Sequence, residues 1–138
     1  MNVLKGSNGQ IDPKFGSIVQ PLYASIRLKL EKADIDQEIK QCSIIAMAQF
    51  IAVCHKSLNE SQIGDVIKIF NDRLQNDMTR DSTLKALVRI TSNRGVNIPN
   101  IAMLSPRMFD LLHKAQRTIH LNTLEALWSM VTSYPQQF

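Results

Sequence analysis

Residues 39–50 read IKQCSIIAMAQF, residues 79–90 read TRDSTLKALVRI, and residues 119–130 read IHLNTLEALWSM. Each stretch begins 40 residues after the one before it, and the three align without a gap. Small residues fill two columns of this alignment, which are Ser43, Thr83 and Thr123, and Ala46, Ala86 and Ala126. Because the two columns are three residues apart, both lie on one face of a helix, where short side chains let a neighbouring helix approach closely. The chain therefore repeats one helix and the contact that the helix makes.

A helical period of this length is typical of stacked helical hairpins, of which HEAT and armadillo repeats are examples. The sequence predicts an all-α fold, a HEAT-repeat α-solenoid segment of about three antiparallel helical hairpins. We place these hairpins at about residues 17–57, 58–95 and 96–138. Residues 1–16 hold three of the five glycines and are expected to form a flexible lead-in.

The prolines predict a difference between the first and third hairpins. Pro21 lies 18 residues before Ile39, whereas Pro106 lies 13 residues before Ile119. A proline is tolerated in the first turn of a helix, so each marks a position near the start of the first helix in its hairpin. The larger spacing predicts that the first inter-helix turn is several residues longer than the third.

Composition narrows the possible classes of protein. The chain has 138 residues, of which 44% are hydrophobic, enough to bury a continuous core. Its net charge of +4 comes from 16 basic and 12 acidic residues without a block of like charge, which does not favour a nucleic-acid partner. No stretch approaches about 18 uncharged apolar residues, so we expect no membrane span. Residues 1–9 lack the apolar core of a signal peptide, and a cytoplasmic or nuclear location is expected.

The sequence offers no chemistry for catalysis, metal binding or a cofactor. Cys42 and Cys54 lie about 18 Å apart if they share a helix, beyond disulfide reach, and we expect both to be small buried apolar side chains. We expect His55, His113 and His120 on helix surfaces, because none is spaced from the thiols as a metal ligand would be. A glycine-rich phosphate loop and a GxSxG motif are both missing from the sequence. We therefore predict no enzyme, no catalytic residue, no metal and no cofactor.

A basic column follows the first residue of each repeated stretch, at Lys40, Arg80 and His120. One interpretation is structural: each basic side chain pairs with an acid of a neighbouring inter-helix turn, such as Asp36 or Asp77, and holds the repeats together. The other interpretation is functional: the column is a row of donors for an acidic partner. The sequence favours the structural interpretation without excluding the second.

Other columns of the alignment vary in chemistry, as recognition of an individual partner requires. Lys85, Arg89 and Arg94 predict a local basic patch. Trp128 is the largest candidate for an interface anchor, although the sequence favours a role in filling space against a next repeat. The candidate protein-interaction surface is therefore Lys40, Arg80, Lys85, Arg89 and Trp128.

Several segments together resemble one family of HEAT-repeat proteins. The stretch ADIDQEIK at residues 33–40, preceded by PLY at residues 21–23, closely resembles the middle of the cullin-associated NEDD8-dissociated (CAND) protein family. The likeness continues in the same order through RLQN at residues 73–76, TLKAL at 83–87, KAQR at 114–117 and LNTLEAL at 121–127. It covers about residues 15–138, and the ADIDQE turn is its most specific part.

This resemblance implies a regulatory scaffold. CAND proteins are long HEAT-repeat solenoids that wrap around an unneddylated cullin and its RING subunit, and they promote exchange of substrate-receptor modules on cullin-RING ubiquitin ligases without a catalytic site. It thus implies an internal segment of such a scaffold, which binds a cullin-RING complex in the context of a longer parent chain. The alternative is a generic HEAT-repeat protein-interaction adaptor, similar to karyopherins or phosphatase scaffolds.

The final residues predict a further property of the isolated segment. An array that stops after the second helix of a hairpin, without a polar capping repeat, leaves apolar side chains in contact with water. We therefore expect apolar surface at this end and self-association of the isolated segment.

Overall fold

The computed structural model describes residues 13–32, 36–93, 95–114 and 116–138. Within these ranges the chain forms six α-helices, which are α1 (Val19–Glu31), α2 (Gln37–Cys54), α3 (Glu60–Arg73), α4 (Arg80–Thr91), α5 (Ser105–Leu111) and α6 (Arg117–Ser133). Short 3-10 helices lie at Pro13–Ile18, His55–Ser57, Ile101–Leu104 and Pro135–Gln137. The all-α prediction is confirmed. Most of the predicted lead-in, residues 1–12, lies outside the described residues.

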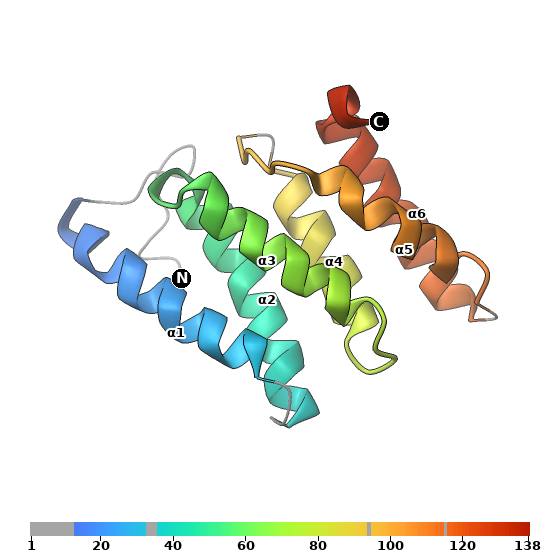
Figure 1. Ribbon diagram of the computed structural model, residues 1–138, viewed down its shortest axis with the longest axis horizontal. Helices are drawn as coiled ribbons and strands as arrows, with labels where there is room; N and C mark the ends of the chain where they lie inside the picture. Colours follow the sequence, from blue (N-terminus) through green and yellow to red (C-terminus); the bar gives the residue numbers. More distant parts are fainter. Residues whose placement is uncertain (1–12, 33–35, 94, 115) are drawn as a thin grey trace.

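The helices form two layers, with α1, α3 and α5 in the first and α2, α4 and α6 in the second (Figure 1). In the second layer α4 packs between α2 and α6. The α2–α4 and α4–α6 contacts are the most extensive contacts between helices in the fold. Helix α1 packs on α2, and α5 packs on α6, so that antiparallel hairpins stack side by side. This is the stacking that the 40-residue period predicts. No helix in the described part of the chain is long and apolar enough to span a membrane.

Two helices begin at polar side chains that satisfy free main-chain amides. Asp36 precedes α2, and its carboxylate accepts a hydrogen bond of 2.8 Å from the amide of Glu38. Asn59 precedes α3 and forms a capping box with Gln62, in which each side chain pairs with the main-chain amide of the other residue. Such caps replace the helical partners that the first amides lack.

The inter-helix turns differ from the prediction. Residues 32–36 separate α1 from α2, and residues 112–116 separate α5 from α6, so the first and third turns have the same length. The prediction of a longer first turn is wrong because the extra residues lengthen the helix: α1 has 13 residues and α5 has 7. Pro106 is the second residue of α5, a position where no helical hydrogen bond is lost.

The column of Ser43, Thr83 and Thr123 shows how hydroxyl-bearing residues are accommodated on a packed helix face. The hydroxyl oxygen donates to the main-chain carbonyl four residues earlier, at 2.7 Å for Ser43, 2.8 Å for Thr83 and 2.6 Å for Thr123. All three side chains are buried. Because each hydroxyl is satisfied within its own helix, it enters the contact with a neighbouring helix without the cost of an unpaired polar group.

The alanine column shows which face of each second-layer helix meets the preceding helix. Ala86 of α4 and Ala126 of α6 are buried, since α2 covers the first and α4 covers the second. Ala46, at the same position of α2, is exposed, because no helix of the second layer precedes α2 among the described residues. The alanine column therefore marks a stacking face that is covered in α4 and α6 and open in α2.

Side chains also join hairpins by donating to main-chain carbonyls of a neighbouring hairpin. These bonds link residues 39 to 43 positions apart, so they repeat the sequence period in space. They run from Tyr23 to Gln62, from Arg73 to Leu30, from Asn93 to Ala52 and from Ser133 to Thr91. Because main-chain carbonyls exist at every position, such bonds leave no mark in the sequence of the accepting residue.

Tyr134, which follows α6, is a buried tyrosine whose titration affects stability. Its hydroxyl donates to the carbonyl of Val96 at 2.7 Å, and desolvation by burial raises the pKa of Tyr134 from 10.0 to about 12. In the unfolded chain the pKa returns to about 10, so between about pH 10 and 12 the unfolded state loses a proton that the folded state keeps. The stabilisation is present in full below pH 10 and is lost as the pH rises.

We predict that Tyr134→Phe removes part of this pH dependence. The variant should lose about 1 kcal/mol at neutral pH, because the bond to Val96 is gone. Above about pH 10 the wild-type free energy of unfolding should fall more steeply, by up to about 3 kcal/mol, than that of the variant. Denaturant unfolding at a series of pH values measures both slopes. Parallel curves for the two proteins above pH 10 would refute this role of Tyr134.

Candidate protein-interaction surface

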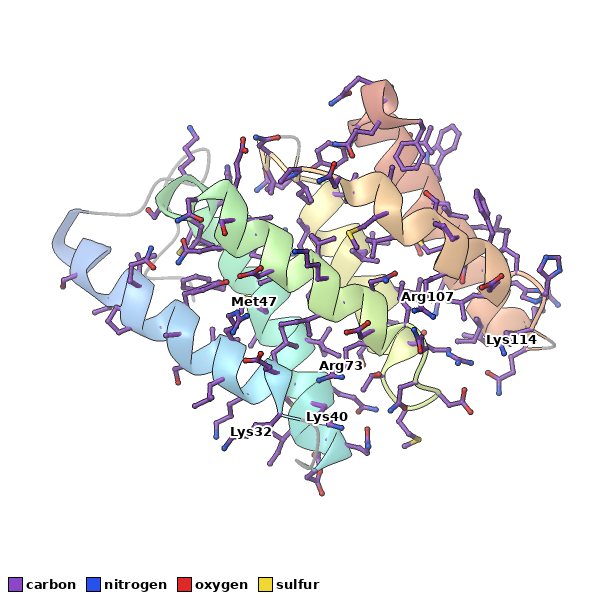
Figure 2. All side chains as sticks on the ribbon, in the orientation of Figure 1. Lys32, Lys40, Met47, Arg73, Arg107 and Lys114 are labelled. Carbon is purple, nitrogen blue, oxygen red and sulfur yellow. The ribbon has the colours of Figure 1, made fainter. Side chains whose placement is uncertain are left out.

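The five predicted site residues fall into two groups, and Lys40 and Arg80 form the buried group. They are 5% and 8% exposed and lie in the first turns of α2 and α4. Figure 2 shows Lys40 near the start of α2, on the side of the molecule where the two helices of its hairpin are connected. Both side chains are therefore buried, and their predicted place on an exposed surface is not what the structure shows.

Arg80 shows what the basic column does. Its guanidinium donates to the carbonyl of Gln75 at 2.9 Å and pairs with the carboxylate of Asp77 at 2.7 Å. His120, at the next position of the column, contacts the carbonyl of Lys114 through Nε2. For both residues the partner lies in the turn of the same hairpin. The structural interpretation is therefore correct for Arg80 in a modified form. Among the described residues, the contacts of Arg80 stabilise the turn of its own hairpin and do not link it to another hairpin.

Two side chains join the first and second hairpins on this side of the molecule, and the sequence did not single out either as a site residue. Gln41 of α2 donates from its side-chain amide to the carbonyl of Met78 at 2.6 Å, and the other is Arg73. Arg73 ends α3, and its guanidinium donates to the carbonyl of Leu30 in the last turn of α1 at 2.7 Å. Carbonyls at a helix C-terminus lack helical partners and carry partial negative charge, so an arginine is a suitable donor there. A basic residue in the last turn of a helix was the available signal, but its acceptor depends on where α1 ends.

The second group consists of Lys85, Arg89 and Trp128, which lie on the second layer. Lys85 is exposed and pairs with Asp81 at 3.0 Å, one helical turn earlier on α4. Such surface pairs contribute little stability, so the ammonium is available to a partner. Arg89 is half-buried and donates from Nε to the side chain of Gln49 on α2 at 2.7 Å. The basic patch is thus anchored at Arg89 and open at Lys85, and its third predicted member, Arg94, lies outside the described residues.

Trp128 is 74% exposed, more than any other large hydrophobic side chain among the described residues. It lies on α6 beside a shallow pocket of about 290 Å³ that is also lined by Val88, Glu125 and Thr132. Trp128 is therefore on the surface of the described chain, and its packing against a next repeat stays a prediction. An exposed tryptophan offers a large apolar area with little loss of conformational entropy, as binding anchors do.

Exposed and half-buried positions of the second layer together form a candidate binding surface, which we call the second-layer face. Its members are Ile45 and Gln49 of α2, Lys85 and Arg89 of α4, and Glu125 and Trp128 of α6. It combines two exposed apolar side chains with basic, acidic and amide groups. Protein interfaces have this composition, with aromatic anchors in a polar surround.

Two further predictions about single residues are wrong. His55 is buried, although a helix surface was expected, and neither of its ring nitrogens has a hydrogen-bond partner among the described residues. It lines a pocket of about 190 Å³ with Glu60, Gly95 and Asn97. Cys42 is exposed, although burial was expected, because the face of α2 that carries it has no helix packed on it, whereas Cys54 is buried as predicted.

The stacked antiparallel hairpins define the class of protein as a HEAT-repeat α-solenoid segment. No family model matches the chain. The chain is 32% identical over 124 residues to cullin-associated NEDD8-dissociated protein 1 of Drosophila melanogaster, which covers 88% of the chain and 10% of that relative. The proteins of the same name from Arabidopsis thaliana and Dictyostelium discoideum are 29% and 30% identical, over 97% and 86% of the chain and 11% and 10% of those relatives.

The family resemblance inferred from the sequence is therefore confirmed, and the chain belongs to the CAND family. It spans about a tenth of the length of these relatives. The match extends over all three hairpins, because it covers nearly nine-tenths of the chain or more in each comparison.

Proposed function

We propose that this chain is a scaffold segment that binds a cullin-RING ubiquitin ligase core as part of a longer protein, and so regulates ligase assembly and substrate-receptor exchange. The observation that carries the proposal is the match of almost the whole chain to proteins named as cullin-associated and NEDD8-dissociated. The proposed role is binding, without a catalytic step.

The second-layer face supports a binding role. Trp128 supplies an exposed aromatic anchor, and Lys85 supplies a charge whose present partner, Asp81, is itself at the surface. Exchange of an exposed ion pair for a partner's carboxylate costs little, because both pairs are screened by water. The face therefore suits a partner that offers an apolar pocket beside acidic groups.

The test is a binding titration of the longer protein that contains this chain, immobilised on a sensor, with purified cullin-RING complex. We expect saturable binding to the unneddylated complex and weaker binding to the NEDD8-modified complex. Lys85→Glu and Trp128→Ala should each weaken binding about tenfold, since they remove a charge complement and an anchor. Lys68→Glu makes the same charge change on an exposed residue of α3, in the first layer, and should bind as the wild type does.

The proposal fails if the longer protein binds neither form of the complex. That result would favour the generic HEAT-repeat adaptor, whose partner is a different protein. Equal weakening by Lys85→Glu and Lys68→Glu would show a general charge effect and would exclude the second-layer face as the site. Circular dichroism of each variant keeps a loss of binding distinct from a loss of fold.

A further inference from the structure

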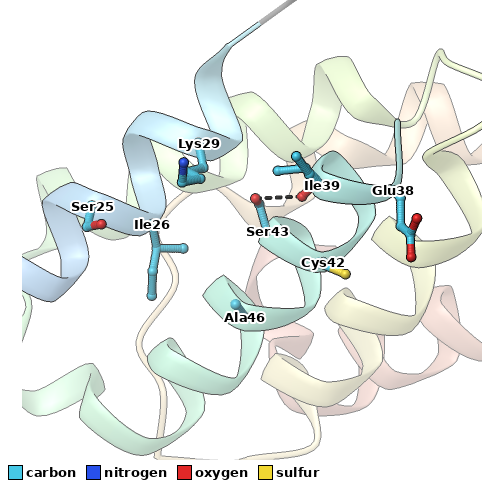
Figure 3. A pocket seen from close by; sticks show the side chains of 8 residues that line it. All are labelled: Ser25, Ile26, Lys29, Glu38, Ile39, Cys42, Ser43 and Ala46. Atoms are coloured by element: carbon cyan, nitrogen blue, oxygen red, sulfur yellow. Dashed lines mark hydrogen bonds between the residues drawn. The ribbon is translucent and has the colours of Figure 1, made fainter. Parts of the chain in front are cut away.

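Arg89 lies on α4, the helix of the second layer that has a neighbouring helix on both sides. In the longer protein proposed above, the groove of about 410 Å³ between α1 and α2, which contains Ala46, adjoins a preceding hairpin, so its exposure indicates no partner (Figure 3). Arg89 differs from such residues because it is half-buried with α2 and α6 already in place. Continuation of the array in either direction therefore does not cover its side chain.

One of the three guanidinium nitrogens of Arg89 is held by the neighbouring hairpin. Nε donates to the side-chain oxygen of Gln49 on α2 at 2.7 Å, whereas Nη1 and Nη2 have no hydrogen-bond partner among the described residues. Arg73 and Arg80 each keep a buried and unpaired Nε, but no nitrogen of Arg89 is both buried and unpaired. The two terminal nitrogens, which carry four of the five N–H donors of the side chain, therefore reach solvent.

Arg89 also differs from other arginines of the chain in having no carboxylate partner among the described residues. Arg27 pairs with Glu31 at 2.9 Å, and Arg80 pairs with Asp77 at 2.7 Å. The partner of Arg89 in the described chain is a neutral amide. A half-buried charge that has lost part of its water gains most from a group of opposite charge.

The acidic side chains of the second-layer face do not balance the charge of Arg89. Asp81 pairs with Lys85 at 3.0 Å, so these two charges compensate each other. Glu125 lines a pocket between α4 and α6, whereas Gln49 holds Arg89 at the contact of α4 with α2. One positive charge is thus left unbalanced beside α2.

A carboxylate is the group that matches this arrangement. With Nε occupied, Nη1 and Nη2 remain free for two parallel N–H···O bonds, which suit the two oxygens of a carboxylate. The single charge of a carboxylate balances the single charge of Arg89, whereas a phosphate monoester carries about −1.5 to −2. Ile45 is exposed one helical turn before Gln49 and offers an apolar contact next to the charge, as protein interfaces do.

We propose that Arg89 binds an aspartate or glutamate side chain of the protein partner through Nη1 and Nη2, and that Gln49 is the positioning residue that orients the guanidinium. The proposal rests on the proposed function, because it names the chemistry that the second-layer face recognises. A guanidinium that is already held at Nε loses less conformational freedom when the partner binds. Recognition of the partner therefore depends on a bond between two hairpins.

The test measures binding of purified, unneddylated cullin-RING complex to the longer protein that contains this chain. Arg89→Gln should weaken binding about tenfold, because it removes the charge and the two-pronged donor. Arg89→Lys keeps the charge without the planar fork and should weaken binding about threefold. Arg107→Gln is the matched control. It changes a half-buried arginine whose guanidinium also contacts a glutamine, Gln75, but which lies on α5 in the first layer, and it should bind as the wild type does.

Gln49→Met tests the positioning role, because methionine has nearly the size of glutamine and lacks the carbonyl oxygen that accepts from Nε. The substitution should weaken binding about threefold in the wild type and have no further effect in Arg89→Gln, since Gln49 acts through Arg89. Gln49→Glu should weaken binding about as much as Arg89→Gln, because the new carboxylate takes the charge of Arg89. Equal losses from Gln49→Met in both backgrounds would overturn the positioning role.

The outcomes separate this proposal from the proposed function. Wild-type binding that Arg89→Gln leaves unchanged overturns the role of Arg89 and leaves cullin binding in place, whereas absence of wild-type binding removes both. Equal losses for Arg89→Gln and Arg107→Gln would show a general charge effect and overturn the proposal. Phosphatase treatment of the complex should not change the affinity. If it weakens binding of the wild type and not of Arg89→Gln, the bound group is a phosphate, and the assignment of a carboxylate is wrong.

Discussion

Replacing Phe50 with alanine is expected to lower the free energy of unfolding by about 3–5 kcal/mol. Phe50 is fully buried in α2, and its ring lies 6.4 Å from the ring of Tyr23 of α1, measured between centroids. The substitution removes the apolar contacts of a whole ring and leaves a cavity between the layers, which packed neighbours fill only in part. Because domains of this size are stable by about 5–15 kcal/mol, the loss is a large share of the total.

Phe109→Ala is the matched control for this prediction. It deletes the same atoms from an exposed ring on α5, and we expect a change of about 0.5 kcal/mol or less. Urea unfolding followed by circular dichroism measures both variants, with equal slopes of free energy against urea as the check on two-state behaviour. Similar losses for the two variants would mean that Phe50 is not in the core between α1 and α2.

Enlarging Ala86 to leucine is expected to destabilise the chain by about 1–3 kcal/mol. Ala86 lies buried in the face of α4 that meets α2, where the column of small residues keeps the two helices close. Leucine has nearly the helix propensity of alanine, so the cost arises from overpacking and not from the helix itself. Helix α4 packs on α2 and on α6, and in this variant its contact with α2 should be the first of the two to open as the chain unfolds.

Ala46→Leu makes the same change at the equivalent position of α2, which is exposed in the single chain. Its free energy of unfolding should stay within about 0.5 kcal/mol of the wild type at concentrations where sedimentation shows monomers. A larger loss for Ala46→Leu than for Ala86→Leu would contradict the assignment of the covered and open stacking faces.

Much of the fold could be predicted from the sequence because the stacking contact repeats its chemistry. Ser43, Thr83 and Thr123 make the same hydrogen bond to the carbonyl four residues earlier in three helices. Their spacing alone therefore located α2, α4 and α6. The length of the first inter-helix turn could not be predicted. It depends on how far α1 extends along α2, and α5 is shorter because a 3-10 helix occupies residues 101–104 before it.

The candidate site was predicted less well than the fold. Lys85 and Trp128 were singled out as varying positions and are exposed, so their role in an interaction stays a prediction. Lys40 and Arg80 share one alignment column at the start of α2 and α4, and both are buried, with the partners of Arg80 in the turn before its own helix. Whether a basic residue points to solvent or to its own turn is set by turn geometry, which residue spacing does not encode.

The central claim is that the 40-residue period is the stacking of one hairpin on the next, and a single cross-link tests it most directly. The hydroxyl oxygens of Thr91 in α4 and Ser129 in α6 lie 2.6 Å apart, so two thiols at these positions are within disulfide reach. In a Cys42→Ser background, Thr91→Cys with Ser129→Cys should form a disulfide within the monomer and raise the unfolding midpoint relative to the reduced protein. Two thiols that stay free in the folded, oxidised monomer, or that link only separate chains, would contradict the stacked array.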